Sequence, residues 1–231
     1  MEIRKLDWDS AFFGMRIGRV DVMEPGDMIT LAFRQKELSE QFDLLYVFDP
    51  NHFGFSARDA ALVDEKVIFS KFCEEKENFS DVMTYEQSVP NESLYQLALV
   101  SGEFSRFRLD KRFPEGSYEK LYLRWIENAC PSEGTNKQIF VYIQNGIAQG
   151  MITVDYAGDH AQIGLVAVHP GYQHKGIGSK IMSTMEGYLY KKGVMTIEVA
   201  TQNANEDACR WYAKNGYIVQ SVTPVYHWWL K

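Results

Sequence analysis

Residues 17–22 alternate between apolar and polar side chains, and residues 44–48 form a short unbroken apolar run. Alternation with a period of two indicates a half-buried strand, and a short apolar run before turn residues indicates a buried strand. Asp27 lies between them, where its side chain can cap a helix through about residue 41. Ser56 is placed to cap a short helix through residue 62, and the alternating residues 66–72 predict a third strand. The beginning of the chain is therefore predicted to be a small α/β unit.

The pattern becomes helical from residue 92, where apolar residues recur at three- and four-residue spacing, and again from residue 117 to about residue 130. Three strands are predicted next, at residues 138–143, 151–155 and 161–168. Asn145 and Gly146 separate the first two strands, and Asn-Gly favours the positive φ angles of a type I′ hairpin turn. The three strands are therefore predicted to form an antiparallel meander.

After a glycine-bearing loop, Ile181, Met185 and Leu189 repeat at four-residue spacing and predict an amphipathic helix that ends at Gly193. The rest of the pattern predicts a strand, a helix and a final strand, at residues 196–201, 205–215 and 217–222. Residues 73–91 are acidic and show little periodicity, so we place a domain boundary near residue 85. This gives an N-terminal α/β unit, residues 1–85, and a second domain, residues 86–231.

The composition excludes several classes of function. The 231 residues carry a formal net charge of −7 without a basic cluster, so no nucleic-acid partner is expected. Three widely spaced cysteines without CxxC spacing indicate neither a disulfide framework nor a metal site, which favours a reducing cytoplasm. No apolar stretch approaches the roughly 20 residues that a membrane span requires. We therefore expect a cytoplasmic protein that neither enters a membrane nor binds a metal.

The loop after the third meander strand has the pattern of a phosphate-binding site. A strand that leads through glycines into a helix presents unpaired amides and the positive end of the helix dipole to an anion. Gly176 and Gly178 lack a Cβ, which would let the backbone approach a diphosphate closely. The alternative is a tight strand-to-helix connection whose glycines only permit close packing. A P-loop is excluded, because Ile177 and Gly178 stand where its lysine and hydroxyl residue belong. A dinucleotide fingerprint is excluded as well, because Ile181 occupies the place of the third glycine.

The remaining pattern, Gln-x-x-Gly-x-Gly after a strand, resembles motif A of the GCN5-related N-acetyltransferases. The resemblance implies that the loop holds the pyrophosphate of acetyl-coenzyme A through Gln173, His174, Lys175, Gly176, Ile177, Gly178 and Ser179. It also implies that the backbone of Val166 and Val168 pairs with the pantetheine arm as an added strand would. The order of elements over residues 92–231 is similar to that family's acyl-CoA N-acyltransferase fold. We therefore expect an α/β (α+β) fold with a mixed, mainly antiparallel sheet.

Two residues near the end of the chain match further positions of this family. Tyr212 lies in a helix that resembles motif B, which implies that its phenol protonates the departing coenzyme A sulfur. A phenol with a pKa near 10 is protonated at neutral pH and can serve as this acid. The alternative role is packing, because an aromatic residue on an amphipathic helix commonly faces the core. Asn205 is implied to hold the pantetheine chain or a water, and the alternative role is capping the next helix.

The general base remains unassigned, because the strand before the loop carries no carboxylate. The nearby titratable residues are Asp155, His169, Glu198 and His227, and a water relay is equally open. Acetyl transfer is expected to proceed by direct attack of the amine, since no cysteine occupies a motif position.

The N-terminal unit is expected to recognise the amine. Residues 6–14, 62–67, 199–202 and 226–228 resemble stretches of the dTDP-fucosamine acetyltransferases, which implies a nucleotide-linked amino deoxysugar as the acceptor. Trp8, Phe12 and Phe13 could form the acceptor wall, and Arg16 and Arg19 could meet phosphates. The alternative role of these residues, favoured for any single one, is a hydrophobic patch that packs the two domains together. A peptide, protein or small-molecule amine is the alternative acceptor, and a non-catalytic acyl-CoA-binding module is the alternative function. A homodimer is as open as a monomer.

Overall fold

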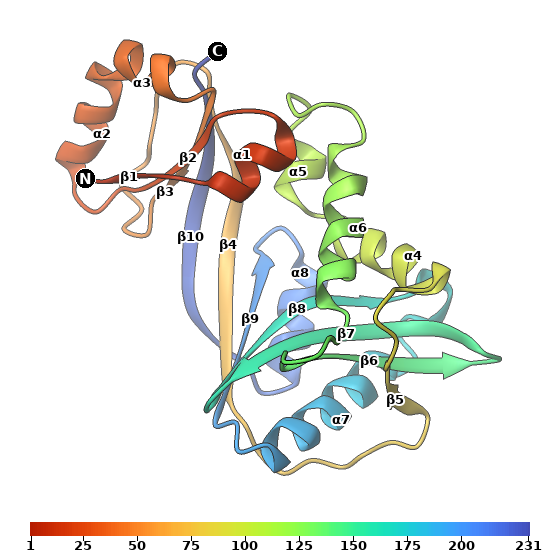
Figure 1. Cartoon of the computed structure of the whole chain (residues 1–231). Coiled ribbons are helices and arrows are strands. Elements are labelled where there is room, and N and C mark those ends of the chain that lie inside the picture. The colour runs from red at the N-terminus through yellow and green to blue at the C-terminus, as the bar shows by residue number, and fades with distance from the viewer.

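The computed structural model describes residues 1–231, which build a ten-stranded sheet in the order β1-β2-β3-β10-β4-β9-β8-β7-β6-β5, with helices on both faces (Figure 1). The strands are β1 (Ile3–Lys5), β2 (Ile17–Asp21), β3 (Leu44–Phe48), β4 (Ala60–Phe72), β5 (Val82–Thr84), β6 (Lys137–Gln144), β7 (Ile147–Ala157), β8 (His160–Val168), β9 (Thr196–Gln202) and β10 (Ile218–Trp229). The helices are α1 (Asp7–Phe13), α2 (Pro25–Phe33), α3 (Gln35–Gln41), α4 (Glu92–Ser101), α5 (Arg106–Leu109), α6 (Ser117–Ala129), α7 (Ile177–Lys191) and α8 (Glu206–Lys214). Only the pairs β2–β3 and β8–β9 are parallel, so the expected mixed, mainly antiparallel sheet is confirmed.

The middle of the sheet is buried on both faces. Met151 of β7 belongs to the core formed with α4 and α6, whereas Ile152 and Val154 pack with α7 on the opposite face. Successive side chains of a strand point to opposite faces, so one apolar strand serves both cores. Around the N-terminal strands, Leu31 of α2 and Trp228 of β10 are fully buried in a third cluster.

Most strands and long helices lie where the sequence pattern predicts them. The hairpin prediction is confirmed, because Asn145 and Gly146 both have positive φ angles, 53° and 77°. The helix predicted from Ser56 to residue 62 is wrong, since β4 already begins at Ala60 and pairs with β10 along its length. Hydrogen bonding to a strand that is distant in sequence outweighs the local capping signal here. The single helix expected after Asp27 is two helices, α2 and α3, which meet at Arg34.

The sheet runs without interruption across the boundary predicted near residue 85. β4 and β5 precede this boundary, yet they pair with β9 and β6, which follow it. β10, the last strand of the chain, lies between β3 and β4 and so joins the two parts. The division into residues 1–85 and 86–231 stays a prediction about folding units.

Strands β8 and β9 separate after a short parallel contact. They pair only where His160–Ile163 lies opposite Thr196–Val199. The register of β7 against β8 shifts at Thr153, whose Oγ1 accepts a hydrogen bond from the Leu165 amide at 2.7 Å. A Cβ on Gly164 would lie 2.7 Å from this Oγ1, so the close approach requires glycine. The bulge bends the sheet and leaves the end of β8 without a neighbour on the β9 side.

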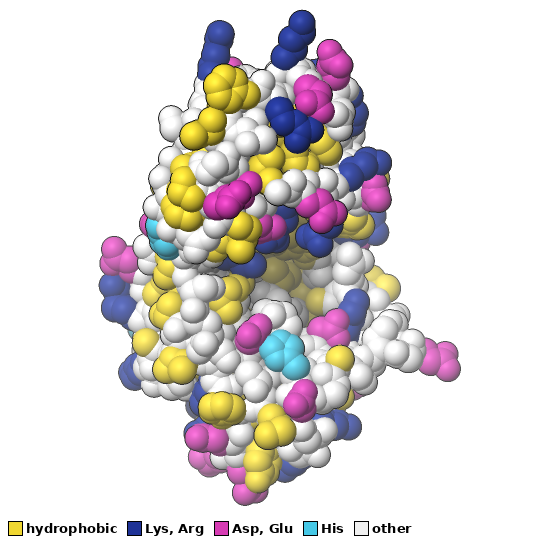
Figure 2. Space-filling view, turned by 90° about the vertical axis from the view of Figure 1, so that its left-hand side faces the viewer, with side chains coloured by type: hydrophobic (Ala, Val, Ile, Leu, Met, Phe, Trp, Pro, Cys, Tyr) yellow, Lys and Arg dark blue, Asp and Glu magenta, His cyan; other side chains and the backbone are white.

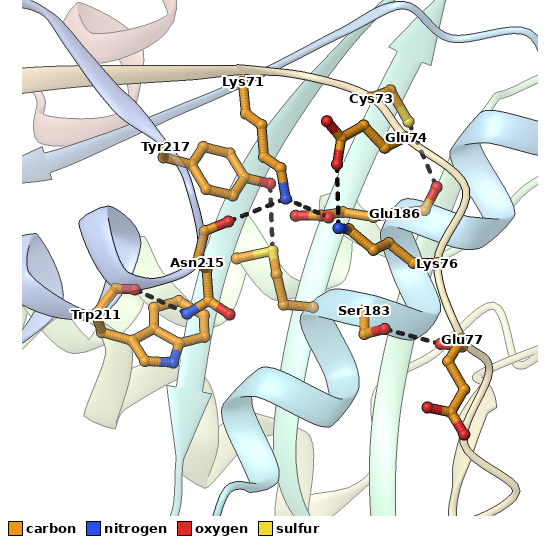
Figure 3. Close-up of polar contacts among 11 residues, drawn as sticks. Lys71, Cys73, Glu74, Lys76, Glu77, Ser183, Glu186, Trp211, Asn215 and Tyr217 are labelled. Atoms are coloured by element: carbon orange, nitrogen blue, oxygen red, sulfur yellow. Dashed lines mark hydrogen bonds and ion pairs between the residues drawn. The ribbon is translucent and has the colours of Figure 1, made fainter.

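A buried ion pair joins helix α7 to strand β4 (Figure 3). Lys71 Nζ of β4 lies 2.6 Å from Glu186 Oε2 of α7 and donates to the carbonyl of Asn215 at 2.9 Å. Both side chains are largely shielded, with 11% of the lysine and 2% of the glutamate exposed. Glu186 therefore connects α7 to β4, and Lys71 extends this connection to the end of α8.

Candidate active site

A cleft of about 650 Å³ opens where β8 and β9 separate. Figure 2, which shows the left-hand side of the view in Figure 1, has a hollow near the middle of the molecule. One end of the cleft is lined by Val166 of β8 and by Asn205 and Tyr212 around α8. The other end is lined by residues of α1, β4, α5 and α6, among them Trp8 and Tyr122. The separation of two strands thus connects the residues expected to hold a cofactor with the N-terminal part of the chain.

Tyr212 lies in the wall of this cleft on α8. Its ring packs against those of Phe69, Trp211 and Tyr217, and only 4% of the residue is exposed. Its hydroxyl makes no hydrogen bond within the chain, although the residue lines the cleft. Burial raises the pKa of Tyr212 well above the usual value, and neighbouring Cys209 adds to this effect. The phenol is therefore protonated at neutral pH and can donate its proton into the cleft. Packing and proton donation, which the sequence presents as alternatives, are compatible here.

The loop after β8 has the geometry of an anion site. His174 and Gly176 have positive φ angles of 60° and 78°, which turn the chain into the first turn of α7. The first amides of a helix have no intrahelical acceptor, so the start of this 15-residue helix can receive an anion. The side chains of the preceding residues stabilise the loop itself: Gln173 Nε2 donates to the Val168 carbonyl at 3.2 Å, and Lys175 Nζ donates to the Gly171 carbonyl at 2.9 Å.

The two glycines of this loop have different roles. Gly176 provides the left-handed backbone conformation, with open space where a Cβ would be. At Gly178 a Cβ would lie 3.1 Å from Cζ2 of Trp211, so this glycine allows α8 to pack against α7. The sequence suggests that both glycines make room for a diphosphate, and the structure shows that Gly178 makes room for an indole.

The open edge of β8 presents the backbone groups expected to bind the cofactor. The amides of Leu165 and His169 both point toward β7, where they donate to Thr153 Oγ1 and to the Gln149 carbonyl. Because amides alternate in direction along a strand, those of Val166 and Val168 point toward the opening. An extended chain could pair with them as a further strand would. Pairing with pantetheine stays a prediction for these two residues.

Asn205 caps α8, as one of its two expected roles requires. Its Oδ1 accepts a hydrogen bond from the Ala208 amide at 3.1 Å. The residue also lines the cleft, where its amide nitrogen makes no hydrogen bond within the chain. Capping uses only Oδ1 and leaves the amide nitrogen of Asn205 free to contact a cofactor. The contact with the cofactor stays a prediction.

The four residues considered as a base lie in different places. Asp155 lines the cleft, whereas Glu198 lies 3.6 Å from His160 and His169 accepts from the Gly171 amide in the exposed turn. His227 is fully buried in the core, with Nδ1 2.8 Å from Asp110 Oδ2. Burial lowers the pKa of His227 to about 4, so it is neutral at pH 7, and it does not line the cleft.

Four charged residues that the sequence did not single out for chemistry line the end of the cleft near α1, β4 and α5. They are Asp9 of α1, Asp64 and Lys66 of β4, and Arg106 of α5. Burial raises the pKa of Asp64 to about 6, although Arg106 and Lys66 oppose the shift. Asp64 and Lys66 are two residues apart on β4 and therefore point to the same face. The sequence signal for Asp64 and Lys66 was their two-residue spacing on a strand, which puts them on one face. It could not show that this face lines a cleft, because the cleft is formed by elements far apart in the chain.

Comparison with known proteins identifies the family. The model of the Acetyltransferase (GNAT) family matches residues 95–217, which include β8, the glycine loop, α7 and α8. The chain belongs to the GNAT acetyltransferase family. As a GNAT enzyme, it is an acetyl-coenzyme A-dependent N-acetyltransferase, which binds acetyl-coenzyme A and an amine substrate.

The relatives of this GNAT protein include one that matches along almost the whole chain. A dTDP-fucosamine acetyltransferase of Escherichia coli O6:H1 is 27% identical to this chain, and the alignment covers 95% of this chain and 94% of that protein. A GCN5-related N-acetyltransferase from Sphaerobacter thermophilus is 13% identical, with a TM-score of 0.58 over 99% of this chain and 76% of that one. A functionally unknown conserved protein from Staphylococcus epidermidis is 12% identical, with a TM-score of 0.63 over 99% and 92% of the two chains. The two structural likenesses show a shared fold. None of the helices combines the length and the apolar composition that a membrane span requires.

Proposed function

We propose that this GNAT enzyme acetylates the primary amine of a nucleotide-linked amino deoxysugar. The observation that carries the proposal is the continuity of the cleft, which leads from Tyr212 to a recess containing both cationic and anionic side chains. Arg106 and Lys66 suit a phosphorylated acceptor, and Asp9 and Asp64 suit an amine. A wholly acidic groove would have favoured a basic peptide. The name of the Escherichia coli relative supports the same acceptor class.

In the proposed arrangement, the start of α7 receives the pyrophosphate of acetyl-coenzyme A and the open edge of β8 receives its pantetheine arm. The proposed contacts of the loop are those of residues 173–179, with Asn205 on the opposite side of the cleft. The thioester would then lie near Tyr212, and the amine would approach from the recess. The bulge at Thr153 supports this arrangement, because it opens the edge of β8 beside the cleft.

The proposed chemistry is a direct transfer. The neutral amine attacks the thioester carbonyl, a carbon–nitrogen bond forms, and the carbon–sulfur bond breaks. Tyr212 donates its proton to the departing thiolate and regains one from solvent. The nitrogen loses a proton to the carboxylate of Asp64, directly or through a water. With a pKa of about 6, Asp64 is ionised at neutral pH yet more basic than an ordinary aspartate.

The aromatic part of the recess adjoins the charged groups. Trp8 lines the cleft, is 47% exposed and stacks on Phe12 with ring centroids 5.1 Å apart. An exposed indole supported from behind is suited to contact a base or an apolar sugar face. Phe13 is instead buried in the core. Arg16 and Arg19, expected to meet phosphates, form ion pairs with Asp43 and Asp21 and do not line the cleft.

The proposal is tested by measuring thiol release from acetyl-coenzyme A with matched acceptors. The panel comprises nucleotide-linked 4-amino and 3-amino deoxysugars, the corresponding methyl glycosides, and amine-bearing peptides. We expect the highest kcat/KM with a nucleotide-linked amino sugar, and loss of that activity in Tyr212→Phe. Preferential acetylation of a peptide would overturn the assignment of the acceptor and leave the family assignment intact.

A further inference from the structure

Arg106 is a half-buried cation without a partner in the chain. Its guanidinium makes no hydrogen bond and no ion pair, and its Nε is fully buried without an acceptor. The group lies over two rings, 5.1 Å from the centroid of Tyr46 and 4.6 Å from that of Phe107. A buried donor without an acceptor is costly and rare, so one at the edge of a cleft points to an acceptor supplied from outside.

Three other arginines in or near the N-terminal unit are paired with aspartates. Arg16 has Asp43, Arg19 has Asp21, and Arg112 binds Asp110 through both Nε and Nη2. The planar guanidinium favours a bidentate acceptor wherever one is within reach. Arg106 instead lies over two aromatic rings and has no carboxylate partner.

Lys66 adds a second unpaired cation to the same recess. It lines the cleft and is half-buried, and its ammonium group forms no ion pair or hydrogen bond within the chain. Burial lowers the pKa of Lys66, and the charges of Arg19 and Arg106 lower it further. Two partly desolvated cations that repel each other are stabilised by an anion between them.

The carboxylates of the recess leave the cations unpaired as well. Asp9 and Asp64 both line the cleft, and neither lies within 4.0 Å of a basic nitrogen in the chain. Charges of both signs therefore lie in one recess, close enough for Arg106 and Lys66 to lower the pKa of Asp64, but without a direct ion pair between them. Such a pattern is complementary to a ligand that carries an anionic group and an amine at separate positions.

We propose that Arg106, assisted by Lys66, binds a phosphate group of the acceptor and is the specificity-determining residue of this acetyltransferase. The inference rests on the proposed function, because it assigns part of the same cleft to the non-reacting end of the acceptor. The phosphate engages the Nη donors of Arg106, while the amine remains on the side of Asp64 and Tyr212. Binding energy from the phosphate then positions the amine for attack.

The binding test uses calorimetry with thymidine diphosphate and with pyrophosphate, in saturating coenzyme A so that the anion site at α7 is occupied. We expect both probes to bind the wild type, and we expect Arg106→Gln to weaken binding about 10- to 100-fold. Arg106→Lys should recover part of the loss, because it keeps the charge without the fork of donors. Absence of binding to the wild type, or wild-type affinity in Arg106→Gln, would overturn the proposal.

Arg108→Gln is the matched control. Arg108 lies on the same short helix, is exposed, and donates to the Glu103 carbonyl outside the cleft. It should bind both probes with wild-type affinity, and the same unfolding temperature in the two Gln variants would exclude a folding defect. With a phosphorylated acceptor, Arg106→Gln should raise the KM for that acceptor far more than it lowers kcat, without changing the KM for acetyl-coenzyme A. Diphosphate binding without acetylation of any nucleotide-linked amino sugar would refute the proposed acceptor while leaving the phosphate site intact.

Discussion

Trp211 lies against the first turn of α7, where a Cβ on Gly178 would be only 3.1 Å from its Cζ2 atom. Its Nε1 also donates to Ser179 Oγ at 3.3 Å. The helix that carries Tyr212 is thereby held against the helix whose first amides are proposed to bind the pyrophosphate. This contact between Trp211 and Gly178 therefore sets the position of Tyr212 relative to the proposed pyrophosphate site at the start of α7.

Gly178→Ala should weaken the binding of coenzyme A, because the added methyl displaces Trp211 and tilts α8 away from α7. Overpacking of this kind costs about 1–3 kcal/mol. If all of this strain falls on the binding loop, the affinity for coenzyme A falls by about 5- to 150-fold. Calorimetry with coenzyme A measures the effect. Gly146→Ala is the control: its φ of 77° makes alanine unfavourable there too, but the hairpin turn is remote from the cleft. Equal affinity in the two variants would show that Trp211 moves without consequence.

Tyr212→Phe should lower kcat by about 10²- to 10⁴-fold while coenzyme A binds as before, because only the donated proton is lost. Steady-state kinetics and calorimetry separate the two effects. Tyr217→Phe is a close control, since Tyr217 is buried in the same aromatic cluster with its hydroxyl 3.3 Å from Met182 Sδ and outside the cleft. If both variants lost activity equally, packing rather than proton transfer would explain the role of Tyr212.

The pH profile of kcat/KM should rise through about pH 6 as Asp64 ionises and becomes able to accept a proton. Burial raises this pKa, whereas the charges of Arg106 and Lys66 lower it. The Asp64→Asn variant should lose most of its activity together with this limb of the profile. An unchanged limb in Asp64→Asn would assign it to another group.

The same carboxylate should make the folded protein less stable as pH rises. Because its folded-state pKa of about 6 exceeds the usual value near 3.9, the folded state binds more protons between these values. The free energy of unfolding contributed by Asp64 therefore falls from about pH 4 to about pH 6, and Asp64→Asn should unfold at higher denaturant concentration at pH 7. Urea unfolding at pH 4 and pH 7 measures the difference, which should be small at the lower pH.

Lys71→Met should destabilise the protein by about 3–5 kcal/mol, because it leaves the carboxylate of Glu186 buried without its counter-ion. The double variant Lys71→Met/Glu186→Leu should recover most of this loss, since both charges are then removed. Arg210→Ala, which breaks only exposed ion pairs with Glu206 and Asp207, should cost less than about 1 kcal/mol. Denaturant unfolding compares the variants, and an unchanged stability of Lys71→Met would show that this ion pair does not stabilise the fold.

Local sequence patterns were sufficient to predict features that depend on a single turn or helix. The Asn145–Gly146 turn, the cap at Asn205 and the apolar face of α7 depend on residues close together in the chain. The predictions failed where pairing across the sequence decides, as at residues 56–62, which lead into a long strand beside β10. The capping signal at Ser56 is worth less than the ladder that β10 provides.

The sequence by itself determined the glycine loop, the meander before it, the helix that carries Tyr212, and with them the acetyltransferase family. These features follow from spacing within one or two neighbouring elements. Only the tertiary structure decided that Gly178 serves Trp211, that Arg16 and Arg19 are paired elsewhere, and that Asp64, Lys66 and Arg106 share a recess with Trp8. The physical reason is that this recess is formed where β8 and β9 separate beneath α1 and α5, and the charge of a residue becomes informative only when its partners, or their absence, are known.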